Sequence, residues 1–194
     1  EKLVDRLIDF QWPDGGWNCD RRPAARKSSF IESLIPLQAL FRYGRKYDHS
    51  RALAAAGRTA DYLLRHQLLY RCRDGRLVKA SWGGDIDTIH YPIRFYDLLY
   101  PLLVMAEMGK IRDQRCRKAL DLLAAKQLED GGFPRELKNA TRTKGIKSRG
   151  TFADWGPAGK TRSNPFISID ALWVLKEAGM INGEISQESR NAGG

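Results

Sequence analysis

A turn motif recurs along this chain at an interval of about 60 residues. Residues 7–17 read LIDFQWPDGGW and residues 123–133 read LAAKQLEDGGF, so a Leu, a Gln four positions later and an Asp-Gly-Gly-aromatic ending coincide. Residues 63–75, LLRHQLLYRCRDG, keep the Leu and the Gln but lack the Gly-x-aromatic ending. Self-similarity at a fixed period predicts an array of units that bury their apolar faces against one another.

Three apolar stretches, residues 29–44, 94–109 and 164–179, each end in a glycine. When they are aligned on that glycine, Leu37 and Leu102 coincide, and a leucine occupies the same position in the third stretch. Apolar residues recur at helical spacing on more than one stripe, which predicts buried, inner helices. The terminal glycines predict left-handed helix caps.

The other helix of each unit is expected to be an outer one. Residues 51–67 and 113–127 are amphipathic and end at the Gln of the motif, which indicates one packed face and one wet face. The sequence therefore predicts an all-α fold of about three helical hairpins. The repeats are expected at residues 1–44, 45–109 and 110–181, within one domain and followed by a polar tail at 182–194.

The turn between the helices has a physical rationale. Two glycines supply backbone angles that other residues resist, and the preceding Asp can accept bonds from nearby backbone amides. The Gln amide can bond the free backbone groups of the turn, and the aromatic ring can cover this polar cluster. We therefore expect structural roles for the Gln and aromatic residues.

The pattern Leu-x3-Gln-x3-Gly-x-aromatic resembles the QW repeat of squalene-hopene and oxidosqualene cyclases, and more broadly the α/α toroid of terpenoid cyclases and protein prenyltransferases. The matching residues are Leu7, Gln11, Gly15 and Trp17, and Leu123, Gln127, Gly131 and Phe133. The resemblance spans about residues 1–181 and implies an α/α toroid. Because a full ring needs more than three hairpins, we expect a partial ring, either a half-ring or a fragment of a longer protein.

The chain is strongly basic, with 33 Lys and Arg against 23 Asp and Glu and a net charge of +10. Such a charge favours anionic partners, including an acidic membrane surface touched peripherally, although a basic outer surface on a soluble protein gives the same composition. No nucleic-acid-binding motif is present, so no nucleic acid partner is expected. An open arc leaves two unsatisfied ends, through which two copies are expected to form a homodimer.

Location and redox state follow from two further features. No apolar run approaches the length of a membrane-spanning helix. The three cysteines, Cys19, Cys72 and Cys116, form no close pair, which indicates reduced thiols and a cytoplasmic location.

The N-terminal ends of the inner helices are expected to converge on one mouth of the ring, where helix dipoles favour an anion. Aromatic, acidic and basic side chains at this mouth would suit a lipid or a sugar. The candidate substrate-binding residues are Phe30, Glu32, Arg94, Tyr96, Asp97, Trp155 and Phe166. The alternative for Glu32 and Asp97 is pairing with arginines at the seams between hairpins.

The segment Asp85-Ile86-Asp87-Thr88 resembles the Asp-x-Asp-Asp-Thr acid motif of squalene-hopene and class II diterpene cyclases. The resemblance implies that Asp87 is the catalytic acid and Asp85 its partner, which requires a carboxylic acid kept protonated by burial. One Asp of the motif is missing here. The alternatives are that Asp87 caps the N-terminus of a helix or that the segment is a solvated loop.

His90 follows this segment and is the third candidate catalytic residue. It is either a hydrogen-bonded structural residue or a base beside Tyr91 and Arg94, as a lyase acting on an acidic polysaccharide would require. A prenyltransferase-like zinc site would need Cys19 or Cys72 near His90, but the spacing does not match that pattern, so neither metal nor cofactor is expected.

The sequence thus favours a terpene cyclase- or prenyltransferase-like protein that binds an isoprenoid or other lipid, and it leaves open whether the chain is an enzyme. A non-catalytic interaction module and a polysaccharide lyase-like enzyme are the alternatives.

Overall fold

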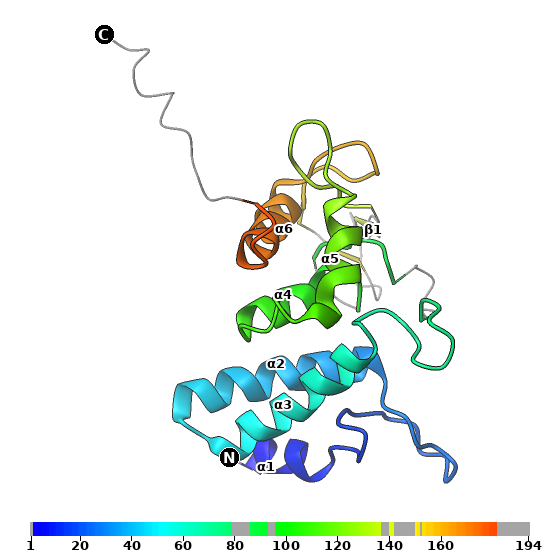
Figure 1. Cartoon of the computed structure of the whole chain (residues 1–194), viewed down its shortest axis with the longest axis vertical. Helices are drawn as coiled ribbons and strands as arrows, with labels where there is room; N and C mark the ends of the chain where they lie inside the picture. Colours follow the sequence, from blue (N-terminus) through cyan, green and yellow to red (C-terminus); the bar gives the residue numbers. More distant parts are fainter. Residues whose placement is uncertain are drawn as a thin grey trace.

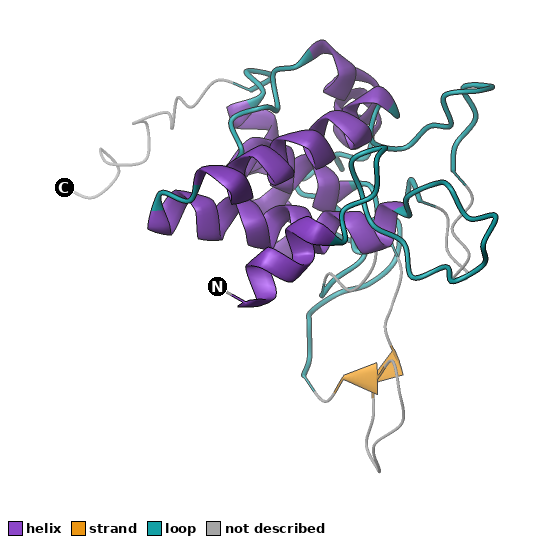
Figure 2. Ribbon diagram, turned by 90° about the horizontal axis from the view of Figure 1, so that it is seen from below, coloured by secondary structure: helices purple, strands orange, loops and turns teal. Residues whose placement is uncertain are grey.

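The computed structural model describes residues 2–78, 86–92, 96–136, 140–141, 150–151 and 153–181. These residues are mainly helical, which confirms the predicted all-α class (Figure 1). The α-helices are α1 (Lys2–Asp9), α2 (Phe30–Tyr47), α3 (Ser50–Arg65), α4 (Leu99–Glu107), α5 (Arg117–Ala124) and α6 (Pro165–Glu177), and a 3-10 helix, η1 (Gln114–Cys116), precedes α5. Strands β1 (Ala140–Thr141) and β2 (Gly150–Thr151) pair in parallel, away from the helices (Figure 2).

The helices predicted as inner ones contact one another, and so do those predicted as outer ones. The inner helices are neighbours in chain order, because α4 contacts both α2 and α6 (Figure 1). In the other row α1 contacts α3, and α3 contacts η1, which leads directly into α5. Each inner helix also packs on an outer one: α2 on α3, and α4 and α6 on α5.

The first and third turns of the repeat have the same hydrogen bonds. Gln11 Nε2 donates to Gly15 O and Gln127 Nε2 donates to Gly131 O, both at 2.9 Å. Gly15 and Gly131 both have positive φ, at 105° and 79°, which explains the glycine at this position. The predicted role of the Gln amide is confirmed in these two turns.

The aromatic residue that ends each of these turns is buried. Trp17 is 8% exposed and Phe133 is 0% exposed. The Trp17 amide donates to Ser33 Oγ at 3.0 Å, and the Phe133 amide donates to Ser168 Oγ at 2.8 Å. These serines occupy the same position of α2 and α6 when the helices are aligned on their glycines, so they belong to the repeat although the turn motif does not contain them.

The first turn is also fixed to the neighbouring outer helix. Gln11 Nε2 lies 2.9 Å from Ala55 O and 2.9 Å from Thr59 Oγ1, both on α3. Thr59 Oγ1 in turn donates to Gly15 O at 2.7 Å. One glutamine therefore closes its own turn and joins α1 to α3.

The middle turn differs, as the loss of its aromatic ending predicts. Gln67 and Leu68 both adopt positive φ, at 46° and 65°. Leu68 and Leu69 are fully buried there, and Tyr70 then pairs with Leu77 in an isolated antiparallel bridge. Two buried leucines thus anchor this turn to the core.

The prediction that Gly44 caps an inner helix was wrong. Helix α2 continues to Tyr47, and Asp48 is the left-handed cap with φ of 49°. Gly44 instead permits close packing of α3, since a Cβ on it would lie 2.7 Å from Leu53 Cγ. Gly109 does follow its helix with positive φ, at 68°.

The predicted start of the second inner helix was also wrong. Helix α4 begins at Leu99, five positions later than the aligned stretch at 94–109 requires. The Asp97 side chain accepts a bond from the Tyr100 amide at 2.8 Å, and Pro101 stands in the first turn, where its missing N–H has no helical partner to lose.

Candidate functional site

A cavity of about 690 Å³ opens beside the N-terminal end of α2. Apolar and aromatic side chains line much of it, and basic side chains line part of the rest, together with an aspartate, two serines and a cysteine. Its lining residues are Asp14, Lys27, Ser28, Ser29, Phe30, Ile31, Tyr62, Arg65, His66, Arg71, Cys72, Arg73, Val78, Ile86 and Tyr96. The cavity therefore combines residues of α2 and α3 with the loops that precede α2 and follow α3.

Three rings pack around Phe30 to form the aromatic part of this lining. The Phe30 ring centroid lies 5.7 Å from that of Tyr62, 5.0 Å from that of His66 and 5.3 Å from that of Tyr96. These are edge-on or tilted contacts, the arrangements that aromatic pairs prefer. Phe30 and Tyr96, both predicted substrate-binding residues, thus meet in one cavity.

The two tyrosines of this cluster are structural rather than acidic groups. Tyr62 Oη donates to Ser28 O and Tyr96 Oη donates to Leu68 O, both at 2.7 Å. Burial raises the pKa of both phenols above the ordinary value of 10. Both hydroxyls therefore stay neutral and hold the loops that border the cavity.

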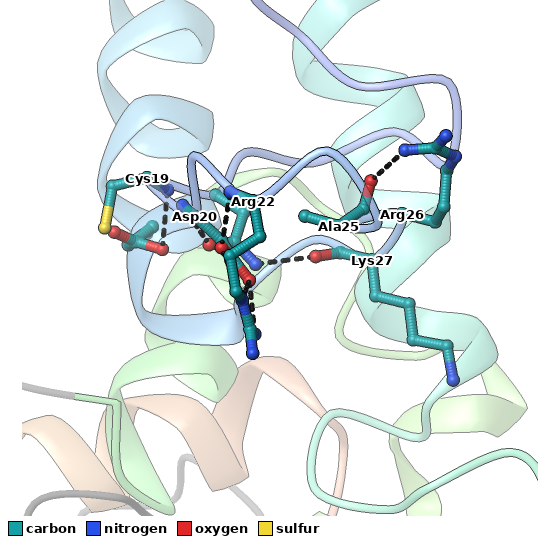
Figure 3. Close-up of polar contacts among 8 residues, drawn as sticks. Cys19, Asp20, Arg22, Ala25, Arg26 and Lys27 are labelled. Carbon is teal, nitrogen blue, oxygen red and sulfur yellow. Dashed lines mark hydrogen bonds and ion pairs between the residues drawn. The ribbon is translucent and has the colours of Figure 1, made fainter.

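The basic residues give the cavity a positive rim. Lys27 and Arg73 are exposed, and Arg65 Nη2 donates to Asp14 O at 2.7 Å. Arg71 forms an ion pair with Asp74 at 2.9 Å. In Figure 3 the Lys27 side chain extends away from its loop. Such a rim attracts anions. The candidate site residues predicted from the sequence included none of these basic residues, although Lys and Arg cluster at 21–27 and 71–76.

Glu32 fixes the loop before α2. Its Oε2 accepts a bond from the Cys19 amide at 3.2 Å, one of the polar contacts in Figure 3. A hydrogen bond from the Cys19 thiol to the Glu32 side chain, and then the carboxylate charge, raise the pKa of that thiol. The predicted role of Glu32 in substrate binding is not supported by the lining of the cavity, which does not include it.

Trp155 and Phe166 belong to a second aromatic cluster. The Phe166 ring stacks on Tyr91, with centroids 5.1 Å apart and an interplanar angle of 11°, and Trp155 contacts both rings edge-on. Neither Trp155 nor Phe166 lines the cavity. The predicted aromatic residues therefore form two separate groups.

Asp97 is a buried helix cap. It is fully buried, and its carboxylate accepts bonds from the His90 amide at 2.9 Å and the Tyr100 amide at 2.8 Å. Burial raises the pKa of Asp97 to about 7, although these bonds lower it. Its predicted position on the rim of a pocket was wrong, and it pairs with backbone amides instead of an arginine.

The candidate catalytic residues stand outside the cavity lining as far as the structure describes them. Asp87 is partly buried, and its neighbour Ile86 lines the cavity, whereas Asp87 does not. His90 also does not line it; Nε2 of His90 lies 3.2 Å from Thr88 Oγ1, and burial lowers the His90 pKa. Asp85 and the predicted binding residue Arg94 lie outside the described residues.

Three observations bear on metals and membranes. Within the described ranges no three His, Cys, Asp or Glu side chains are grouped so as to hold a metal ion. All three cysteines are free, and Cys72 Sγ lies 3.4 Å from His66 Nδ1 in the cavity lining. No helix in the described part of the chain has the length and apolar character needed to cross a bilayer.

Comparison with known proteins returns no match: no family model, no curated protein and no solved structure matches the chain. The resemblance to the QW-repeat cyclases therefore rests on the repeated turn motif of the sequence.

Proposed function

We propose that this chain is a partial α/α toroid, related to terpene cyclases and prenyltransferases, that binds an isoprenoid or other lipid with an anionic head group. The cavity beside α2 carries this proposal, because its aromatic lining and basic rim are adjacent. Its volume of about 690 Å³ lies within the range of small-molecule sites.

The two parts of the lining suit the two parts of such a ligand. An isoprenoid chain would pack on Phe30, Tyr96 and the neighbouring Ile31, which removes apolar surface from water. An anionic head group would lie toward Lys27 and Arg73 and near the N-terminal end of α2, where the helix dipole adds to the positive potential.

The proposal concerns binding. Acid catalysis by Asp87 and proton abstraction by His90 would each require the side chain to reach a ligand in the cavity, and neither residue lines it. The tyrosine hydroxyls that do line it are occupied by backbone carbonyls. A binding role needs only the surfaces described above.

We expect farnesyl diphosphate to raise the melting temperature of the protein by about 5 °C at saturation. The double variant Lys27→Gln/Arg73→Gln should weaken its apparent Kd about tenfold, since it removes two rim charges. The matched control Arg6→Gln/Lys176→Gln loses the same net charge on α1 and α6 and should bind like the parent. Titrations followed by thermal shift measure these effects.

Farnesol and inorganic pyrophosphate separate the contributions of chain and head group in the same assay. Both should bind more weakly than the diphosphate ester, because each fills one part of the site. If farnesyl diphosphate produces no stabilisation, or if both double variants weaken it equally, the cavity is not the binding site and the proposal fails.

A specific observation also favours the interaction module as a second candidate. On α6, Phe166 is 40% exposed, Ile169 is 68% exposed and Trp173 is 40% exposed, and these residues follow helical spacing. Within the described residues, α3, α4 and α5 expose no large apolar side chain to this extent. We propose that a second copy of the chain covers this face of α6.

A homodimer should therefore be seen by sedimentation velocity at micromolar concentration. Ile169→Asp places a charge in the proposed interface and should shift the protein to monomer. Ile35→Asp, on the exposed part of α2, is the matched control, because Ile35 is 56% exposed and lies away from α6. If the parent protein is still a monomer at a concentration 100-fold above that of the assay, on the order of 0.1 mM, the proposed homodimer is excluded.

A further inference from the structure

Arg135 is a buried guanidinium without an ion pair. The residue is only 4% exposed, and it follows the buried Phe133 turn by two positions. Its Nε is buried and has no hydrogen-bond partner, and no ion pair joins Arg135 to a carboxylate within the described residues. An arginine stays charged at every ordinary pH, so burying it without a partner costs free energy that the fold must recover elsewhere.

His90 presents a second unfilled nitrogen in the same region. Its Nδ1 is buried and has no hydrogen-bond partner, while Nε2 lies near Thr88. The chain segments of the two residues are joined directly: the Glu136 amide donates to Ile89 O at 3.1 Å, and the Ile89 amide donates to Glu136 Oε2 at 2.8 Å. His90 and Arg135 are each one residue away from this pair of bonds.

The carboxylates nearby are already engaged. Glu136 pairs with Lys126 at 2.8 Å, and the two side chains are 7% and 21% exposed. Asp97 accepts bonds from backbone amides and has no ion pair among the described residues. Lys126 thus has a carboxylate partner in this region, whereas Arg135 has none among the described residues.

We infer that Arg135 and His90 form a buried site for a small oxyanion, a phosphate or a carboxylate group. A planar guanidinium and an imidazole N–H are the donors that such groups accept from in proteins. The anion would fill the two free nitrogens and balance the charge of Arg135. This site shares no residue with the lining of the cavity beside α2, so it goes beyond the proposed lipid function.

A purely structural role does not account for the buried, unpaired nitrogen of Arg135. A structural arginine in a protein interior normally has its nitrogens occupied by carbonyls or carboxylates. Arg71 also has a buried Nε without a partner. It differs from Arg135 because its side chain is 33% exposed and forms an ion pair with Asp74. Burial and the missing ion pair together distinguish Arg135 from it.

Titration with inorganic phosphate, against sodium chloride of equal ionic strength, tests the site. We expect phosphate to raise the melting temperature by about 5 °C at saturation and isothermal calorimetry to show one phosphate per chain. Acetate in place of phosphate distinguishes a carboxylate site from a phosphate site. Arg135→Met keeps the apolar stem without the charge and should abolish the phosphate-induced shift, and His90→Asn, which keeps a shorter amide, should reduce it.

The control is Arg115→Met, because Arg115 is ion-paired with Asp113 on the surface and should leave the phosphate response intact. Phosphate stabilisation that persists in both Arg135→Met and His90→Asn would overturn the inference, and so would the absence of any phosphate or acetate effect on the parent protein. If Arg135→Met does not fold, the response of His90→Asn decides. The Lys27→Gln/Arg73→Gln variant should keep its phosphate response, which separates this result from failure of the lipid proposal.

Discussion

Phe133→Ala is expected to lower the free energy of unfolding by about 3–5 kcal/mol, the usual range for truncating a buried aromatic residue. Phe133 is 0% exposed, and it is the largest fully buried side chain in the part of the chain that the structure describes. Its amide is held by Ser168 and its carbonyl accepts a bond from the Asn164 amide at 2.8 Å, so the turn cannot readily collapse into the space left by the ring.

Urea unfolding followed by circular dichroism measures this loss. Phe10→Ala is the matched control, because Phe10 also lies near an Asp-Gly-Gly turn but is 69% exposed, and its replacement should change stability by no more than about 0.5 kcal/mol. A loss below about 1 kcal/mol for Phe133→Ala would mean that the aromatic residue does not hold the repeat together.

The second large effect concerns Asp97 and pH. Burial raises the folded-state pKa of Asp97 to about 7, above the ordinary value of 3.8. The folded state therefore keeps a proton that the unfolded chain has released, and stability falls as pH rises between these two values. From pH 5 to pH 8 this residue alone should remove about 2–3 kcal/mol.

Replacement of Asp97 by Asn should remove this slope, since an amide does not titrate, although losing one of the two oxygens that accept from the His90 and Tyr100 amides lowers stability at every pH. The measurement is a series of urea transitions between pH 5 and pH 8. Asp113→Asn is the control: the Arg115 guanidinium holds the pKa of Asp113 at about 2, so its contribution is lost only in acid and the slope over this range should persist. A parent protein whose stability is constant or rises over this range would contradict the expected sign.

The repeat could be predicted because its signals are local. Gln11 and Gln127 lie at the same distance from a glycine, and the same hydrogen bonds form in both turns. The burial of Trp17 and Phe133 follows from the same pattern, because an aromatic ring beside a closed polar turn has apolar helices on its other side.

The start of α4 could not be predicted from the alignment. The alignment extends the stretch back to residue 94, but the helix begins at Leu99, and the Asp97 side chain accepts a bond from the Tyr100 amide in its first turn. Periodicity measures which residues can share a helical face; whether a backbone amide bonds to a carbonyl or to a side chain depends on neighbours from elsewhere in the chain.

The candidate site was predictable only in part. Phe30 and Tyr96 were identified because they are aromatic residues near the beginnings of the first two aligned stretches, and they do line one cavity. Arg65, the last residue of α3, and Arg71, in the loop that follows, were missed because their proximity to Phe30 depends on how α3 and its loop return to α2.

By itself the sequence determined the helical class, the repeat and the residues that close its turns, since these depend on apolar periodicity within a helix and on a short turn motif that recurs along the chain. The tertiary structure alone decided which charged groups became buried. Asp97 found backbone amides, and Arg135 found no carboxylate among the described residues, because burial and partnership are properties of several chain segments packed together.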